Sequence, residues 1–476
     1  MAEILKTDLC IIGAGALGTA MALKARARML SVVLVQRPGD VPGESARAEL
    51  QRACLLASAD RAQAMRNAGE LGLTRADPKP NFRLIGERAA AIADAAAPAS
   101  AADRLAALGV TVLSEAATFT DPRTLKVGAE TVRAGQFVLA TGSRAEVPAL
   151  PGLDQIAYFT PDSILDNVRK LSHLVVIGGS APAFELAQAY ARLGAGVTLV
   201  PHGPVLPGFD AELVAILLRA LREEGVAILE GAQVTAILPR AQGTGIALAH
   251  ADGSLATLDV SHVLVASGRV PELDPGLLGA ARLKRDPLRP DHLLVNLQGR
   301  TSNRHVVAIG GAAGVYDRQT ALRQAAIVLQ HASGQAGGRI EPQQLVRMVS
   351  TTPPLAQIGL SDADGPLRPG QVVLRANASE TEAAQATGNL QGSAKLVVAG
   401  NGAIAGGAVL GAGAGETVGM LAMAIERGMG VADLAGLLLP PASAAAALHD
   451  LAEQFIGQQR PSPWARRWAA IARPWR

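Results

Sequence analysis

The sequence of 476 residues predicts an α/β protein that ends in an α+β domain. The prediction rests on two glycine-rich turns, at residues 13–18 and 178–183, each of which follows an apolar run and opens an alanine-rich segment. A strand that leads into such a turn and then a helix exposes backbone amides at a helix N-terminus, where a pyrophosphate can bind. We therefore expect two Rossmann-like dinucleotide-binding domains, with electron transfer between their dinucleotides.

The first unit is expected to alternate strands and helices, because apolar runs alternate with alanine-rich stretches. Strands are predicted over 4–12, 32–35, 110–113, 124–127 and 137–143, and helices over 19–28, 44–75 and 87–108. In a dinucleotide fold the residue after the second strand meets the adenosine ribose. Here that residue is Gln36, followed by Arg37. The amide of Gln36 can hydrogen-bond a hydroxyl, although more weakly than the usual carboxylate.

The second unit repeats this pattern and is followed by a return to the first unit and by the α+β part. Its strands are predicted over 174–177, 197–200 and 263–267, and its helices over 183–193 and 210–224. Residues 271–340 contain an apolar strand, 306–309, that ends at Gly310 and Gly311, and a helix from about residue 318. The last part has predicted strands at 370–374 and 394–409 and helices at 415–428 and 442–455.

Composition limits the class of protein. The chain is too long for one core, and no uninterrupted apolar run approaches the roughly 20 residues of a membrane span. The net charge of +3 gives no reason to expect a nucleic-acid partner. The two cysteines, Cys10 and Cys54, suit a reducing compartment. We expect a cytoplasmic protein without a secretory signal and without a metal site.

Six motifs follow one another in a characteristic order, at 13–18, 140–143, 178–183, 266–271, 301–311 and 352–360. In the order of these motifs the chain resembles the pyridine nucleotide–disulfide oxidoreductase family, which includes dihydrolipoamide dehydrogenases. Residues 185–194 are most similar to mercuric reductases. The resemblance runs from about residue 5 to 455. It implies FAD on the first unit, NAD(P)H on the second, and a homodimer formed through the C-terminal domain.

The resemblance also implies domain limits and cofactor-binding residues. The FAD domain would comprise 1–150 and 271–340, the NAD(P) domain 151–270, the dimerisation domain 345–455, and a tail 456–476. The residues expected at FAD are Gly13, Gly15, Ala16, Gly18, Gln36, Arg37, Ala117, Ala140, Thr141, Gly142, Ser143, Gly310 and Gly311. Those expected at NAD(P)H are Gly178, Gly179, Ser180, Ala183, His202, Ala266, Gly268 and Arg269.

Both nucleotide sites depart from the family pattern. Gly311 stands where the family has an Asp that bonds the flavin ribityl chain. Ser180 replaces the glycine that lets the backbone approach a pyrophosphate, and its small side chain can be tolerated. His202 follows the second strand of the NAD(P) unit in place of an acid, which gives a slight preference for NADPH. A second unit that keeps its fold without binding nucleotide is the alternative.

The redox chemistry of the family is missing. Its members carry a Cys-x4-Cys pair that relays electrons from flavin to substrate. The match of residues 53–59 to the family places these cysteines near Glu44 and Glu49, so Cys54 is expected to be a buried helix thiol beyond the redox site. A dithiol relay within the chain is therefore impossible.

The acid–base pair of the family is missing too. The stretch that matches its partner-subunit His and Glu, 437–446, contains no ionisable group. His449 and Glu453 follow at i,i+4 spacing, as either a solvated helix face or a displaced dyad. Reduction of disulfides or mercuric ion by the family route is therefore not expected.

Glu185 is the candidate catalytic residue, because it stands where the family has a Glu close to the flavin, paired with a Lys. The same register puts Ala53 at the Lys position. Arg52 or Arg47 could substitute as the partner, or Glu185 could be buried without one. The remaining alternative is an exposed acid near the start of a helix, where the dipole favours it.

The tail contains all three tryptophans, Trp464, Trp468 and Trp475, and it carries arginines but no acids. Either it packs on its own dimer, or it docks on a partner or on an anionic membrane surface.

Two functions remain. The first is an FAD-dependent NAD(P)H oxidoreductase that passes electrons directly from flavin to a small acceptor such as a quinone. The alternative is a pseudoenzyme that serves as a dimeric scaffold or a regulatory nucleotide-binding partner.

Overall fold

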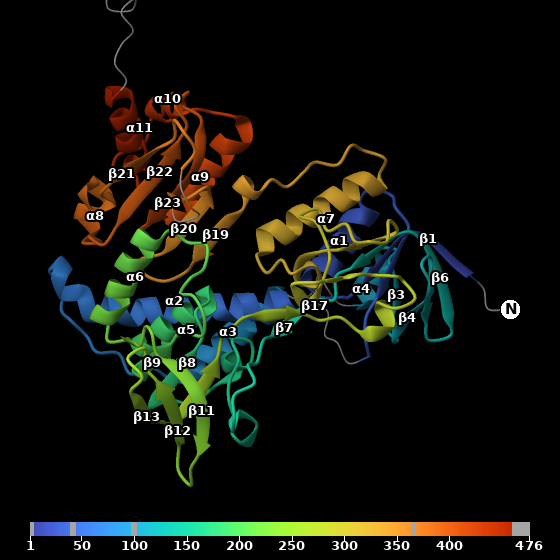
Figure 1. Cartoon of the computed structure of the whole chain (residues 1–476), viewed down its shortest axis with the longest axis horizontal. Helices are drawn as coiled ribbons and strands as arrows, with labels where there is room; N and C mark the ends of the chain where they lie inside the picture. Colours follow the sequence, from blue (N-terminus) through green and yellow to red (C-terminus); the bar gives the residue numbers. More distant parts are fainter. Residues whose placement is uncertain (1–3, 39–43, 97–101, 363–364, 366, 459–476) are drawn as a thin grey trace, which may run out of the picture. The chain divides into compact units, whose positions relative to one another are not determined.

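The structure, a computed structural model, describes residues 4–38, 44–96, 102–362, 365 and 367–458, which fall into two compact units (Figure 1). Unit 1 contains the residues up to Pro207 together with Leu221–Glu341, and unit 2 contains Gly208–Ala220 together with the residues from Pro342 onward. Helix α6 (Ala211–Glu223) passes from one unit to the other. Its first turns therefore belong to the C-terminal unit.

The first sheet of unit 1 has the order β3-β2-β1-β6-β5-β4, and β18 pairs with the end of β6 on the edge opposite β1, which β5 shares at the start of β6. Its parallel strands are β1 (Ile4–Ile12), β2 (Val32–Val35), β3 (Thr111–Leu113), β6 (Glu130–Leu139) and β18 (Val306–Ala308). The antiparallel strands are β4 (Ala117–Asp121) and β5 (Thr124–Val127). Because β18 pairs with β6 in parallel, segments far apart in the sequence share one sheet.

The apolar run of β1 reflects burial on both faces of this sheet. Leu9 and Ile11 belong to a core that includes residues of α1 (Ala16–Arg26) and α7 (Arg318–Ala332). Cys10 and Ile12 belong to a second core with residues of β4, β5 and the segment 277–281. Helices α2 (Glu44–Asn67), α3 (Phe82–Ala96) and α4 (Ala102–Ala107) lie between β2 and β3 in the chain. The single helix predicted over 87–108 is therefore wrong, since α3 begins earlier and ends at Ala96.

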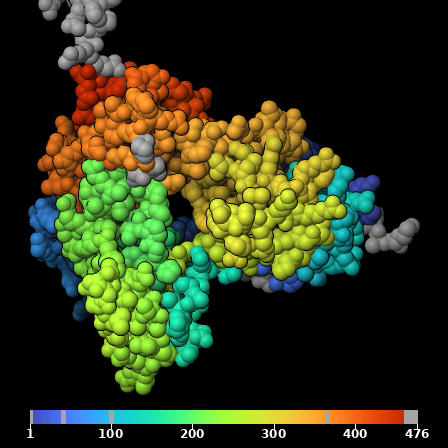
Figure 2. All heavy atoms as spheres, in the orientation of Figure 1, coloured from blue at the N-terminus to red at the C-terminus, as the bar shows by residue number. Residues whose placement is uncertain are grey.

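The second sheet of unit 1 is parallel, with the order β10-β9-β8-β14. Its strands are β8 (His173–Ile177), β9 (Gly196–Val200), β10 (Ala227–Ile228) and β14 (His262–Val265), and α5 (Ala181–Arg192) connects β8 to β9. The sequence did not predict the antiparallel sheet of β11 (Gln233–Pro239), β12 (Thr244–Ala249) and β13 (Leu255–Val260). This sheet forms the protruding yellow-green part of unit 1 (Figure 2). Its strand β13 is almost wholly exposed and gives no apolar signal.

Short strand pairs complete unit 1. They are β7 (Ser143–Ala145) with β15 (Arg269–Pro271), and β16 (Arg285–Asp286) with β17 (Arg289–Leu293). The β7–β15 pair links the turn after β6 to the segment after β14.

Unit 2 is a five-stranded antiparallel sheet whose core is closed by helices. The strand order is β19 (Val346–Val349), β20 (Leu355–Gly359), β23 (Ile404–Leu410), β22 (Ser393–Val398) and β21 (Val372–Ala376). The helices are α8 (Glu382–Thr387), α9 (Ala414–Arg427), α10 (Val431–Ala435) and α11 (Ala446–Gln458). The sequence predicted the last helix from residue 442, which is wrong because Ala442 has a φ of +54°, in the left-handed region.

The tryptophan- and arginine-rich segment 459–476 lies outside the described residues. Within the part of the chain that is described, no helix combines the length and the apolar character that crossing a membrane requires.

Candidate functional site

The first glycine turn joins β1 to α1 in a space that only glycine fits. A Cβ atom on Gly13 would overlap the carbonyl oxygen of Ala140, and one on Gly18 would overlap the carbonyl oxygen of Gly13. The turn after β6 therefore packs directly against the turn after β1. Gly15 is the N-cap of α1 and provides no side-chain cap. The backbone amides at this helix N-terminus suit a pyrophosphate.

Two buried oxygen atoms beside this turn lack a hydrogen-bond partner among the described residues. They are Oε1 of Gln36, which follows β2, and Oγ1 of Thr141, which follows β6. Both strands flank β1, and ligands of open α/β sheets bind at the carboxyl ends of such strands. Because a buried unpaired polar atom costs about 1–3 kcal/mol, both oxygens suit a bound ligand. These residues fit the adenosine and pyrophosphate half of FAD.

On the ribityl side of the predicted FAD site, the protein itself fills the space around Gly311. A Cβ atom on Gly311 would lie 2.6 Å from the carbonyl carbon of Gly142 and 2.9 Å from Cβ of Ser143. The turn after β6 therefore fills the space that an Asp side chain at position 311 would need. The chain has no room at position 311 for the carboxylate that the family carries there. Glycine is therefore the residue that fits the packing around this position.

Other residues predicted at FAD are engaged by the protein itself. Arg37 forms an ion pair with Glu272 at 2.7 Å. Ala117 is the first residue of β4 and pairs with Val127 of β5. Their roles at FAD remain predictions.

The second glycine turn keeps its close packing despite Ser180. A Cβ atom on Gly178 would overlap the carbonyl oxygen of Ala266, just after β14. The hydroxyl of Ser180 donates a hydrogen bond to that same oxygen at 2.9 Å. Ser180 is the N-cap of α5, and Ala183 in the first turn is fully buried. The Ser180 side chain is therefore tied to the strand end and leaves the backbone of the turn in place.

The loop after β9 covers the other side of this turn. The carbonyl oxygen of Pro204 occupies the position that a Cβ atom on Gly179 would take, and Leu206 donates its N–H to the carbonyl of Gly179 at 2.8 Å. His202 lies exposed on this loop.

Arg269, which the sequence predicted at NAD(P)H, binds residues of the protein. Its guanidinium donates to Oγ of Ser143 at 2.9 Å and to the backbone carbonyl of Ser143 at 2.8 Å. It also pairs with Asp162 at 3.0 Å. A Cβ atom on the neighbouring Gly268 would lie 2.7 Å from Oε2 of Glu146, which would have to shift, and its φ of +154° is one that other residues rarely adopt. Arg269 thus connects the segment after β14 to the turn after β6.

One face of α2 carries three polar residues at i, i+4 and i+7 spacing, namely Ser45, Glu49 and Arg52. Each contacts the first half of a different helix. Oγ of Ser45 accepts from the backbone N–H of Ala16 in α1 at 3.3 Å, which connects it to the first glycine turn. The other two residues make ion pairs with α7 and α5.

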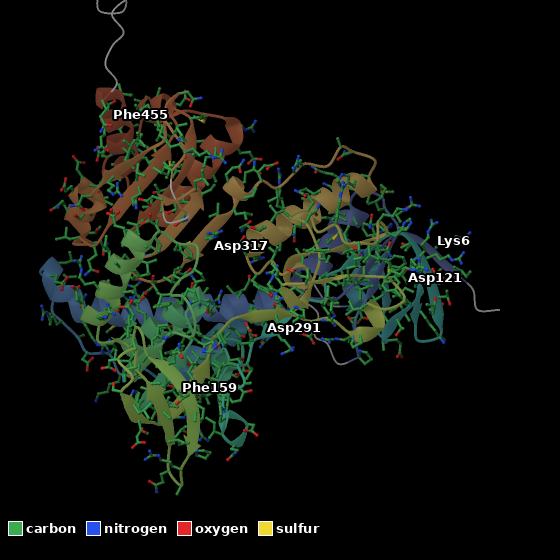
Figure 3. The ribbon with its side chains drawn as sticks, in the orientation of Figure 1. Lys6, Asp121, Phe159, Asp291, Asp317 and Phe455 are labelled. Carbon is green, nitrogen blue, oxygen red and sulfur yellow. The ribbon has the colours of Figure 1, made fainter. Side chains whose placement is uncertain are left out.

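The ion pair to α7 joins Oε2 of Glu49 to Nη1 of Arg318 at 3.2 Å. Arg318 is the first residue of α7 and follows the N-cap residue Asp317, which is labelled in Figure 3. The sequence did not predict this pair, although the family register had placed Glu49 at a cysteine position. The ion pair to α5 joins Nε of Arg52 to Oε2 of Glu185 at 3.7 Å. The face of α2 thus borders both dinucleotide units.

Glu185 is only 4% exposed, so the interpretation as an exposed helix acid is wrong. Of the two suggested partners, Arg52 makes the contact, whereas Arg47 pairs with Asp94 of α3. The side chain of Arg52 is 33% exposed, so the pair lies at the edge of the buried region.

Both cysteines are free and buried. Burial raises the pKa of the Cys10 thiol far above its usual range. Cys54 is a buried residue of α2, as the sequence predicted. Neither thiol has a second cysteine with which to relay electrons.

The stretch 437–446 presents apolar side chains, and Leu438 within it is fully exposed. In α11, which follows, Glu453 is exposed and His449 is half-buried. Exposure of Glu453 favours the solvated helix face over a displaced dyad.

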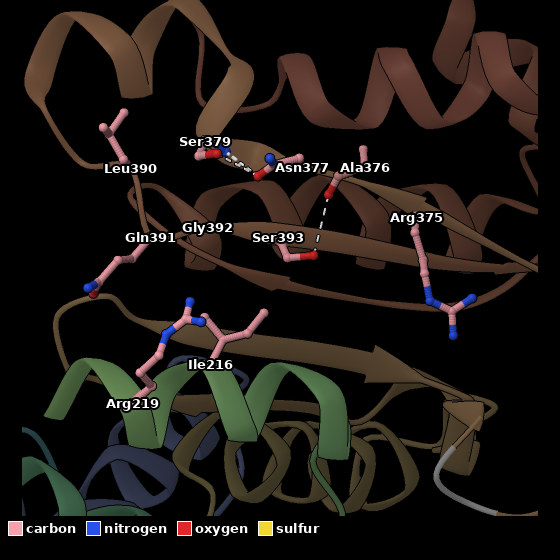
Figure 4. A pocket seen from close by; sticks show the side chains of 10 residues that line it. All are labelled: Ile216, Arg219, Arg375, Ala376, Asn377, Ser379, Leu390, Gln391, Gly392 and Ser393. Atoms are coloured by element: carbon pink, nitrogen blue, oxygen red, sulfur yellow. Dashed lines mark hydrogen bonds between the residues drawn. The ribbon is translucent and has the colours of Figure 1, made fainter. Parts of the chain in front are cut away.

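A cavity of about 420 Å³ lies within unit 2 (Figure 4). Ile216 and Arg219 of α6 face Leu390 and Gln391 across it. Its polar residues are used by the fold: Ser393 donates to the carbonyl of Ala376, Ser379 donates to Asn377, and Arg375 pairs with Glu212 and Asp362. The face of α2 in unit 1 is therefore the better candidate site.

Comparison with known proteins agrees with this geometry. Residues 7–334 match the family model "Pyridine nucleotide-disulphide oxidoreductase", and residues 346–451 match its dimerisation domain. A mercuric reductase of Streptomyces lividans is 28% identical over 460 residues, which cover 94% of this chain and 96% of that protein. A dihydrolipoyl dehydrogenase of Thermus scotoductus is 30% identical over 447 residues, which cover 91% and 94%.

Solved structures show the same fold. LpdA of Mycobacterium tuberculosis superimposes with a TM-score of 0.82 at 23% identity, over 94% of this chain and 99% of that one. The flavoprotein disulfide reductase RclA of Escherichia coli does so with a TM-score of 0.80 at 19% identity, over the same shares of the two chains. The predicted α/β fold with a C-terminal dimerisation domain is confirmed. The chain belongs to the pyridine nucleotide–disulphide oxidoreductase family, whose members are FAD-dependent pyridine nucleotide oxidoreductases.

Proposed function

We propose that this chain is an FAD-dependent NAD(P)H oxidoreductase that passes electrons directly from the flavin to a small non-disulfide acceptor such as a quinone. One observation carries the proposal. The face of α2 that contacts α1 and α5, the helices that follow the two glycine turns, bears two ion pairs, Glu49–Arg318 and Arg52–Glu185, and no thiol pair.

FAD, when bound, would take two electrons from the reduced nicotinamide and supply them to the acceptor. The amides of the first glycine turn would hold its pyrophosphate, and Gln36 and Thr141 would bond its polar groups. The second turn, at Gly178–Ser180, would hold NAD(P)H. Because no carboxylate follows β9, where His202 lies exposed, we expect a slight preference for NADPH.

Glu185 would act at the junction of the two dinucleotides. Its buried carboxylate is balanced by Arg52, and a fixed charge pair in a low-dielectric region orients neighbouring groups without reorganisation. We assign it to the positioning of the nicotinamide against the flavin.

The apolar stretch 437–446 supports an apolar acceptor. In a homodimer formed through the dimerisation domain, this stretch would face the partner's site, as the resemblance implies. The exposed Leu438 would then cover the acceptor with apolar surface. A quinone needs such a surface and no thiol chemistry.

An absorption spectrum of the purified protein tests the proposal. We expect a yellow protein that NADPH or NADH bleaches under anaerobic conditions and that a soluble quinone then reoxidises. A colourless protein that FAD does not reconstitute would overturn it. That result would favour the pseudoenzyme alternative, which the closed space at Gly311 supports.

A further inference from the structure

We propose that Glu49 transfers the proton that a quinone-type acceptor needs, and that Arg318 positions its carboxylate. This inference rests on the proposed function and names the residue that completes the reaction on the acceptor side. It concerns the ion pair between α2 and α7, for which the resemblance assigns no role.

The stoichiometry requires a proton from the protein or from solvent. Reduction of a quinone to a quinol adds two electrons and two protons. NAD(P)H supplies two electrons and one proton as a hydride and becomes NAD(P)+, so one further proton must come from solvent. The stretch 437–446, where the family has its acid–base pair, has no ionisable group to provide it.

The position of Glu49 suits this transfer. It lies between Ser45 and Arg52 on the face of α2 that touches the first glycine turn and α5. Its side chain is 41% exposed, so it can exchange protons with water. Glu185, at 4% exposure, is shielded from such exchange.

The charges around Glu49 hold its carboxylate in place. Arg318 contacts it at 3.2 Å from the start of α7. On the same helix, Arg52 pairs with Glu185 of α5 and Arg47 pairs with Asp94 of α3. As negative charge develops on a quinone oxygen, repulsion between like charges makes a neighbouring carboxylate take up a proton more readily. That proton can then pass to the oxygen.

If the Glu49–Arg318 pair had a purely structural role, replacement of Glu49 would have a different effect on turnover. An ion pair with both side chains this exposed contributes little to stability. Replacement of Glu49 would then either leave turnover unchanged with every electron acceptor or lower it to the same extent with each of them. Proton transfer, in contrast, affects only acceptors that take up protons.

The experiment uses the FAD-loaded protein with two acceptors, a short-chain quinone and ferricyanide, which takes one electron and no proton. For E49Q we expect turnover with the quinone to fall about tenfold or more, the lower end of acid–base effects because water can partly substitute. Turnover of E49Q with ferricyanide should stay within about twofold of the turnover of the wild-type protein. E49D should recover much of the quinone activity, and E87Q, which alters an exposed pair with Arg83 on α3, is the matched control.

A second measurement does not depend on turnover. Negative charge that develops on the flavin during reduction favours proton uptake by a nearby carboxylate in the same way as charge on the quinone oxygen. The slope of the flavin midpoint potential against pH should therefore differ between the wild-type protein and E49Q. Equal losses with both acceptors, or an unchanged quinone rate and slope in E49Q, would overturn the inference while leaving the proposed function standing. If the unchanged protein reduces neither acceptor, the proposed function itself falls, and this inference with it.

Discussion

Gly311→Asp restores the residue that the family carries at this position, and we expect it to weaken FAD binding. From chemistry alone, the restored carboxylate would add a charge-assisted hydrogen bond and increase affinity by about 1.5–3 kcal/mol. The packing predicts the opposite sign. The new Cβ atom would lie 2.6 Å from the carbonyl carbon of Gly142 and 2.9 Å from its oxygen, inside contact distance of the backbone.

The magnitude follows from the cost of overpacking. A side chain forced against backbone typically costs about 1–3 kcal/mol. Gly311 is not in the left-handed region, so this cost is steric and not conformational. Since the turn at Gly142 and Ser143 must move, Thr141 beside it would be displaced from its place at the cofactor. We therefore expect FAD affinity to fall about fivefold to a hundredfold and the thermal midpoint to fall by a few degrees, roughly.

The assay is titration of the apoprotein with FAD, followed by flavin fluorescence, together with thermal unfolding. Gly279→Asp is the matched control, because it adds the same charge to unit 1 at a position with no atom within 4 Å of the new Cβ. Gly311→Ala separates the steric effect from the charge. If Gly311→Asp binds FAD as tightly as the unchanged protein and keeps its thermal midpoint, the packing argument is refuted.

Three further predictions concern the ion pairs and the apolar stretch. Arg52→Ala should remove the cation that contacts the buried Glu185 carboxylate, which lowers the stability by about 1–3 kcal/mol after discounting for the partial exposure of Arg52. Urea unfolding measures this change, and stopped-flow reduction by NADPH should slow. Lys395→Met should remove a cation that is 4% exposed and contacts three carboxylates in unit 2, at a cost of about 3–5 kcal/mol in urea unfolding. A hydrogen bond from Lys395 lowers the pKa of Glu212, so the ionised Glu212 stabilises the fold above the ordinary pKa of a Glu, and this stabilisation is lost as pH falls. The free energy of unfolding should therefore fall less steeply on acidification in Lys395→Met than in the wild-type protein. An unchanged slope against pH would contradict this. Leu438→Asp should leave the thermal midpoint unchanged, because the side chain is fully exposed, and should raise the KM for a quinone several-fold; an unchanged KM would exclude it from the acceptor site.

Local chemistry accounts for the parts of this protein that sequence patterns predicted. Steric demands at Gly13 and Gly18 and the apolar run of β1 act over a few residues, so the strand, turn and helix were predictable. The last helix shows where local patterns fail. Its alanine-rich sequence is continuous, but the left-handed Ala442 delays its start to Ala446. The sheet of β11–β13 was missed because β11 and β13 are largely exposed, and the short apolar run of the buried β12 does not by itself distinguish a strand from other elements.

The features of the candidate site likewise separate into those that the sequence determines and those that only the tertiary structure decides. The sequence by itself determined the family, the two glycine turns, the single thiol of α2 and the lack of ionisable residues at 437–446, because each is a matter of residue identity at a register position. Only the tertiary structure decided that Glu185 is buried, that Arg52 is its partner, and that Glu49 meets Arg318. These pairs join residues more than a hundred positions apart, and only the folding of unit 1, which packs α2 against α5 and brings Glu49 to the first residue of α7, places their charges within reach of each other.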